Sequence, residues 1–232
     1  MTFVTPILEF DCVSLRKVAH GQAEMHGVSF RLMPGDLARV QLEPGNEQLP
    51  LADAAEGLIE PDEGSVAFMG ERWPEMTPDR ELALRARIGR VFYGHGWISN
   101  LNVLENLILA QRHHTSRPDP EIMAEAQDLA RSFGLREVPA GRPALVLQRD
   151  LRRAEWIRAF LGQPALILLE RPAFGVAVEH MPLLIGAVET ALARGAAVLW
   201  THEKDTSLAE AALQKCLRFR MLGDTILAET DN

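Results

Sequence analysis

Apolar runs alternate with amphipathic stretches along the chain, in an order typical of an α/β protein. Two unbroken apolar runs, Ala165 to Leu169 and Ala196 to Trp200, predict central strands of a parallel sheet, because such strands are buried on both faces. The segment Met181 to Arg194 between them predicts a helix, and Gly195 follows it in the position that suits a left-handed turn. Together they predict a βαβ unit.

The N-terminal part predicts short strands around a loop and a helix. Val28, Phe30 and Leu32 alternate with polar residues, which indicates a strand with one buried face. Further elements are expected in the order strand 37–42, loop 43–46, helix 49–58 and strand 65–69.

Helical patterns dominate the middle of the chain. Thr77 with Pro78 predicts the start of a helix, and Asp150 is expected to cap another helix at residues 151–161. A strand is expected at 88–92, with further helices at 101–111 and 118–134. No repeat or long linker divides the sequence. We therefore expect a single domain, residues 1–232, with a helical subdomain at about 100–162.

Composition narrows the class of protein. The chain has 232 residues, 47% of them hydrophobic, and a net charge of −8, which excludes an extended nucleic-acid surface because such surfaces depend on Lys and Arg. No apolar run approaches the length of a membrane helix, and the first ten residues do not resemble a secretion signal. Cys12 and Cys216 are far apart, so we expect two buried, reduced thiols and no metal site in a soluble, cytoplasmic chain.

The segment Gly35 to Val66 resembles the opening of an ATP-binding cassette (ABC) ATPase, in which strand, phosphate loop, helix, Pro-Asp-x-Gly and strand follow at fixed distances. Later landmarks keep the family order: RIGRVFY (87–93), NLNVLENL (100–107), ALILLERP (165–172) and WTH (200–202). The resemblance covers residues 7 to 205. It implies a P-loop NTPase core with a parallel central sheet, an antiparallel β portion near the N-terminus and a helical subdomain.

The phosphate loop of that family needs glycines for close approach of the backbone, a Lys for the phosphates and a Ser or Thr for Mg²⁺. Here the resemblance aligns LEPGNEQLP, residues 42–50, with the loop. Gly45 is kept and Asn46 follows it, whereas Glu47, Gln48 and Leu49 stand where the last Gly, the Lys and the hydroxyl belong. Glu43 and Glu47 would repel a triphosphate. Glu47 either caps the empty site at a helix N-terminus or is an ordinary solvated loop residue.

The resemblance also locates altered catalytic positions. Glu170 takes the place of the Walker B Asp and Arg171 that of the general-base Glu, and a guanidinium gives up no proton near neutral pH. Arg171 either pairs with a carboxylate such as Glu170 or Glu179, or contacts a partner. VLQRD, residues 146–150, stands at the signature motif, where Leu147, Gln148 and Arg149 would block the approach that glycines permit.

Two further positions complete the altered site. Tyr93 replaces the Q-loop Gln, and His202 keeps the place of the switch His. His202 would either reach a γ-phosphate or be held by backbone hydrogen bonds at the end of its strand. We expect no metal ligand set, and ATP with magnesium only if weak binding persists.

Three functions are compatible with these residues. The first is a non-catalytic, pseudo-ATPase ABC subunit attached to an integral-membrane permease at the inner face of the cell membrane, possible partners also including a second ABC ATPase. The stretch NLNVLENLILAQRHHT is similar to ATPases of MCE-associated lipid transporters, which suggests lipid transport in the envelope. Trp97, Ile98, Leu101 and Val103 lie either in the permease groove or in the subdomain core. The alternatives are a weak ATP-binding subunit or nucleotide sensor and an α/β scaffold unrelated to transport.

Overall fold

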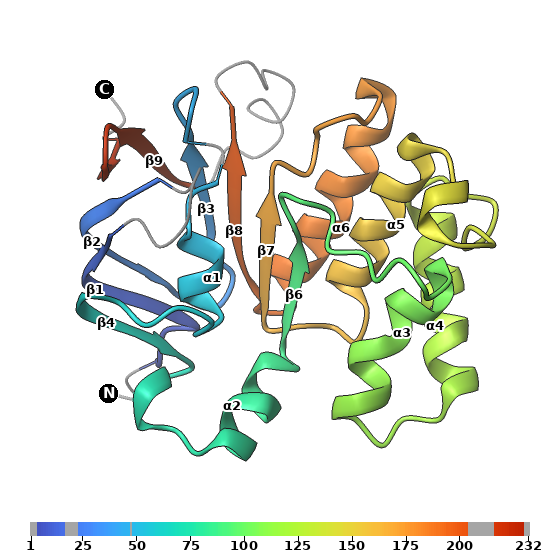
Figure 1. Ribbon diagram of the computed structural model, residues 1–232, viewed down its shortest axis with the longest axis horizontal. Helices are drawn as coiled ribbons and strands as arrows, with labels where there is room; N and C mark the ends of the chain where they lie inside the picture. Colours follow the sequence, from blue (N-terminus) through green and yellow to red (C-terminus); the bar gives the residue numbers. More distant parts are fainter. Residues whose placement is uncertain (1–3, 17–22, 47, 204–215, 230–232) are drawn as a thin grey trace.

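A six-stranded sheet forms the centre of the computed structural model, which describes residues 4–16, 23–46, 48–203 and 216–229. Its strand order is β10-β9-β3-β8-β7-β6, and all neighbours except β9 and β10 run parallel (Figure 1). The strands are β3 (Leu37–Gln41), β6 (Ile88–Val91), β7 (Leu166–Glu170), β8 (Ala197–His202), β9 (Leu217–Leu222) and β10 (Thr225–Ala228). The predicted βαβ unit is therefore present as β7, α6 and β8.

A second, antiparallel sheet has the order β2-β1-β4-β5. Its strands are β1 (Leu8–Leu15), β2 (Met25–Leu32), β4 (Glu63–Phe68) and β5 (Glu71–Arg72). This sheet is the antiparallel portion that the resemblance implies near the N-terminus.

Of the six α-helices of the described residues, α5 and α6 cover the face of the central sheet that lies away from the antiparallel sheet, whereas α1 lies between the two sheets (Figure 1). Three of them, α3, α4 and α5, fall within residues 100–162, the range of the expected helical subdomain. The α-helices are α1 (Leu51–Ala55), α2 (Pro78–Arg85), α3 (Val103–His114), α4 (Asp119–Ser132), α5 (Gln148–Phe160) and α6 (Met181–Ala193). Short 3₁₀ helices are η1 (Trp73–Glu75), η2 (Pro143–Leu145) and η3 (Val178–His180).

The central sheet is buried on both faces, which explains its apolar strands. Leu168 and Leu199 point into one core cluster, shared with the antiparallel sheet and α1. Leu169, Val198 and Trp200 point into a second cluster, shared with α5 and α6. Both sets of alternating positions along β7 and β8 must therefore be hydrophobic.

Two sequence predictions about single residues are wrong. Helix α5 begins at Gln148 with Leu147 at its N-cap position, so Asp150 lies inside the first turn and its Oδ1 accepts a hydrogen bond from Arg153 instead. The two cysteines are not buried as expected: Cys12 is exposed, because it lies at an irregularity in β1 with φ of 51°, and Cys216 is half-buried. Strands β1, β9 and β10 were not assigned from the pattern.

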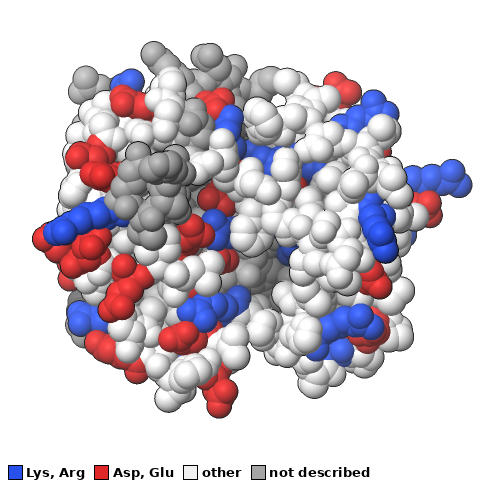
Figure 2. All heavy atoms as spheres, viewed as in Figure 1, with Lys and Arg blue, Asp and Glu red and all other residues white. Residues whose placement is uncertain are grey.

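Charge is distributed unevenly over the fold. The whole net charge of −8 belongs to the first 86 residues, since acidic and basic residues are equal in number in the rest. On the face drawn in Figure 2, acidic side chains gather over the half that contains the antiparallel sheet. Within the part of the chain that is described, no helix is long and apolar enough to cross a membrane.

Gly89 provides a stability test of the contact between β6 and α5. A Cβ atom at Gly89 would lie 1.8 Å from the carbonyl oxygen of Ala159, so backbone would have to move. Gly89→Ala should lower the free energy of unfolding by about 3 kcal/mol, measured by urea denaturation.

Gly186 is the matched control, because a Cβ atom there meets no atom within 4 Å and the residue lies inside α6. Gly186→Ala should raise the free energy of unfolding by about 0.5 kcal/mol through its better helix propensity. Equal effects of the two substitutions would contradict the close packing of β6 on α5.

Candidate functional site

The carboxyl ends of the parallel strands bring most of the predicted site residues together. The loop 42–49 follows β3, Tyr93 follows β6, and Glu170 and His202 end β7 and β8 (Figure 1). A cavity of about 260 Å³ opens between them. Its walls are formed by Gln48, Leu49, Asp53, Arg90, Phe92, Tyr93, Gly94, Gly96 and Glu170.

Arg90 is the central charge of this cavity and was not identified from the sequence. Its Nε donates to Glu170 Oε2 at 2.8 Å, and its Nη1 donates to Asp53 at 2.7 Å and Glu56 at 2.8 Å. Burial alone would lower the pKa of Arg90, but Glu56, Glu170 and Asp53 outweigh burial and raise that pKa. Burial also raises the pKa of the Glu56 carboxyl, against the opposing attraction of Arg90. The signal in the sequence is a charged residue, Arg90, inside a predicted strand, because a buried charge needs a partner of opposite charge.

Glu170, the position predicted for Mg²⁺, is engaged by the protein itself. Its Oε2 accepts both the Arg90 Nε–H and the backbone N–H of Tyr93, the latter at 3.2 Å. Releasing this carboxylate for another ligand would take the acceptor from both the Arg90 Nε–H and the Tyr93 N–H. Within the described ranges no group of three or more His, Cys, Asp or Glu residues is placed to hold a metal ion, and the carboxylates around Arg90 surround a guanidinium instead.

The loop after β3 is attached to the C-terminal hairpin. Asn46 Nδ2 donates to the carbonyl oxygen of Gly223 at 3.0 Å, and the N–H of Gly223 donates to Glu43 at 3.4 Å. Gly45 has φ of 95°, which favours glycine. The position of Glu47 lies outside the described residues, so its predicted capping role stays a prediction.

The two residues that end this loop have different surroundings. Leu49, at the position predicted for the Mg²⁺ hydroxyl, is buried in the core, where its side chain packs against apolar neighbours. Gln48, at the position predicted for the Lys, is exposed at the mouth of the cavity. Neither side chain offers a cation to a phosphate group.

Arg171 pairs with a carboxylate, but not with either one expected from the sequence. Its guanidinium forms an ion pair with Glu203 rather than with Glu170 or Glu179. The same guanidinium lies over the rings of Tyr93 and Phe174, at 5.2 Å and 4.7 Å from their centroids. The expected partner was wrong because Glu170 is already paired with Arg90.

The residues predicted at the signature motif begin α5. Leu147 is exposed, the Arg149 side chain is 74% exposed, and Gln148 Nε2 lies 3.2 Å from His95 Nε2. His202 is buried, and its Nδ1 lies 2.9 Å from the carbonyl oxygen of Glu203. A cavity of about 220 Å³ beside it is lined by Arg171, Pro172, Ala173, Phe174, Trp200, His202 and Glu203.

The four residues considered for a permease groove divide between surface and core. Val103 is fully buried in the helical core, whereas Ile98 is exposed. Trp97 is half-buried and its Nε1 donates to Glu155 at 3.0 Å. On the outward face of segment 97–103, Ile98 therefore lies exposed beside polar residues.

Removing the charge of Arg90 tests the electrostatics of the site. Arg90→Met should lower the free energy of unfolding by about 3 kcal/mol at pH 7, because three carboxylates lose their shared cation. Burial already raises the pKa of the Glu56 carboxyl, and without the opposing attraction of Arg90 that pKa rises further in the folded state. Folding then takes up a proton, so the loss shrinks as the pH falls towards the ordinary carboxyl range. Urea denaturation at two pH values measures both effects.

Arg80→Met is the control, because Arg80 forms an exposed ion pair with Glu71. It should change stability little at either pH. An equal loss for Arg90→Met at both pH values would mean that packing, not charge, explains the effect.

The chain is similar in sequence to known ATP-binding proteins of transport systems. The intermembrane phospholipid transport system ATP-binding protein MlaF of Escherichia coli K12 is 27% identical over 158 residues, which cover 68% of this chain and 59% of MlaF. The octopine permease ATP-binding protein P of Rhizobium meliloti is 27% identical over 192 residues, covering 78% and 73%. The match thus spans about three fifths of the length of MlaF. No protein-family model matches the chain.

Solved structures agree with the fold. The ATP-binding cassette MJ0796 bound to ADP and Pi superposes with a TM-score of 0.82 at 17% identity, covering 96% of this chain and 97% of that one. The ATP-binding subunit of an ABC transporter superposes with a TM-score of 0.78 at 20% identity, covering 97% and 90%. The chain therefore has the ABC ATPase fold and is homologous to ATP-binding subunits of ABC transporters, including one of a phospholipid transport system.

Proposed function

We propose that this chain is a non-catalytic ABC-type subunit of a membrane transporter. The observation that carries the proposal is the pairing of Arg90 with Glu170, which engages the predicted metal-binding carboxylate inside the protein. Arg171 supports the same conclusion, because a guanidinium at the predicted general-base position cannot accept a proton from water. The subunit would then act structurally or as a regulator.

Electrostatics oppose the binding of a triphosphate at this edge. Three carboxylates surround one guanidinium, which leaves an excess of negative charge around the cavity. Glu43 adds another carboxylate on the loop after β3. Two like charges 4 Å apart repel by about 1 kcal/mol in bulk water and by more in a partly dry cleft. ATP would have to overcome this repulsion without a lysine in the loop.

Transport partners are proposed by analogy with the relatives. MlaF and the octopine protein are named as ATP-binding components of transport systems, and MlaF as part of a phospholipid system. We extend this to an integral-membrane permease, to a second ABC subunit as pairing partner, and to lipid transport in the cell envelope. The subunit would lie at the cytoplasmic face of the membrane through that permease.

The emptied site predicts the outcome of a nucleotide titration. Isothermal titration of the full chain with Mg-ATP should show no binding tighter than about 1 mM. MlaF, titrated under the same conditions, is the positive control. Sub-millimolar binding by this chain would overturn the proposal and favour a weak ATP-binding subunit or sensor.

Gln48→Lys adds the cation that the predicted phosphate loop lacks. This variant should still bind no Mg-ATP, because Leu49 stays buried and Glu170 stays paired with Arg90. Binding by Gln48→Lys would show that the missing lysine alone explains the loss.

Co-purification with an integral-membrane permease after co-expression tests the transport assignment, and its consistent failure would favour a scaffold unrelated to transport.

A further inference from the structure

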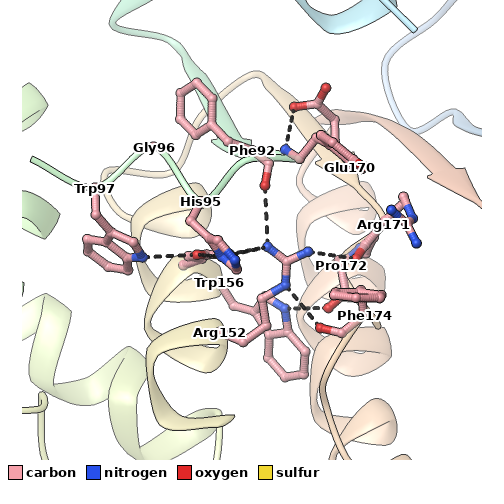
Figure 3. Close-up of polar contacts among 12 residues, drawn as sticks. Phe92, His95, Gly96, Trp97, Arg152, Trp156, Glu170, Arg171, Pro172 and Phe174 are labelled. Carbon is pink, nitrogen blue, oxygen red and sulfur yellow. Dashed lines mark hydrogen bonds and ion pairs between the residues drawn. The ribbon is translucent and has the colours of Figure 1, made fainter. Parts of the chain in front are cut away.

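Helix α5 carries two buried charges beside the segment that follows β6. Arg152 is 2% exposed and Glu155 is 0% exposed, and the two side chains form an ion pair. Figure 3 shows residues of the neighbouring segments, 92–97 and 171–174, converging on Arg152. A buried ion pair is tolerated only when hydrogen bonds satisfy the rest of each charged group.

Arg152 is satisfied by carbonyl oxygens from two separate segments. Its Nη1 donates to Phe92 at 3.3 Å, and its Nη2 and Nε donate to Arg171 at 3.1 Å and to Phe174 at 3.2 Å (Figure 3). One guanidinium therefore connects α5 with the segment after β6 and the segment after β7.

Glu155 completes the connection on the side of the segment after β6. Its Oε1 accepts the Trp97 Nε1–H at 3.0 Å and lies 2.7 Å from His95 Nδ1. His95 has φ of 69°, a left-handed conformation that few residues other than glycine adopt, so contacts must hold it there. The carboxylate supplies one of these contacts.

Arg158, one helical turn further along α5, adds contacts to the same segment. Its Nη1 and Nη2 donate to the carbonyl oxygens of Gly96 and His95, each at 2.7 Å. Its guanidinium also lies 4.8 Å from the ring centroids of Phe92 and of Trp97. Arg158 therefore also holds this segment against α5.

We propose that Arg152 and Glu155 are positioning residues that hold segment 92–98 against α5 in one arrangement without a bound nucleotide. These contacts do not depend on the proposed function. Their consequence for transport does rest on it: a permease that binds around Ile98 would meet a surface that does not change with nucleotide. A subunit that binds no ATP needs such an internal replacement to present a defined surface.

Hydrogen-deuterium exchange of the full chain tests this positioning role. Glu155→Gln keeps the size of the side chain but removes the charge that Arg152, His95 and Trp97 share. Amides of residues 92–100 should exchange about tenfold faster than in the wild type, because loss of a charged acceptor favours local opening. Unchanged exchange in this segment would overturn the proposal.

Arg153→Met is the matched control, since Arg153 is the neighbouring buried arginine of α5. It donates to Phe133, Gly134 and Asp150, none of which belongs to segment 92–98. It should speed exchange near residue 134 and leave residues 92–100 unchanged. Equal acceleration of residues 92–100 by both variants would mean general destabilisation and would also overturn the proposal.

A milder variant covers the case in which Glu155→Gln does not fold. Trp97→Phe keeps an aromatic ring beside Arg158 but removes the indole N–H that donates to Glu155, and it should speed exchange of residues 92–100 by a smaller factor. No change in that variant would count against the role. Failure of the proposed function would appear separately, as Mg-ATP binding or as Mg-ATP protection of the wild-type segment.

Discussion

The ion-pair cluster around Arg90 is the interaction on which the edge of the central sheet depends. Its guanidinium joins β6 to the end of β7 through Glu170 and to α1 through Asp53 and Glu56. Because the cluster is mostly buried, removal of Arg90 would leave three carboxylates without their shared cation. Arg90 therefore helps to position the end of β7, helix α1 and, through Glu170, the backbone of Tyr93.

A second ion pair, between Arg171 and Glu203, engages the residue directly after Glu170 in the same way. Arg171 forms an ion pair with Glu203 and lies over the rings of Tyr93 and Phe174. Glu170 at the end of β7 and Arg171 directly after it thus carry opposite charges, and each is paired with a charged residue from another segment. At the positions predicted for the Mg²⁺ carboxylate and the general base, both side chains are thus engaged in contacts within the protein.

Helix α5 extends this internal organisation to the helical part of the molecule. Arg152 reaches the segments after both β6 and β7, and Glu155 anchors His95 and Trp97 (Figure 3). Each of these buried polar groups on α5 has partners from the protein, as low-dielectric surroundings require. The helical region and the sheet are consequently joined through side chains and backbone carbonyls.

The sequence by itself determined the order and type of most elements. Unbroken apolar runs located β7 and β8, Thr77 marked the start of α2, and Gly195 marked the end of α6, because burial on both faces and helix capping are local properties of the chain. Fixed spacing also identified the fold family. Only the tertiary structure decided the partners of the charges.

Arg90 meets Glu170 from 80 residues away, and Arg171 meets Glu203 rather than Glu170 or Glu179. The same holds for Leu49, which is buried in the core, and for Asn46, whose side chain donates a hydrogen bond to Gly223 between β9 and β10. Such pairs depend on strand order and on the packing of helices against the sheet, and no periodicity along the chain encodes which of several carboxylates will face a given guanidinium.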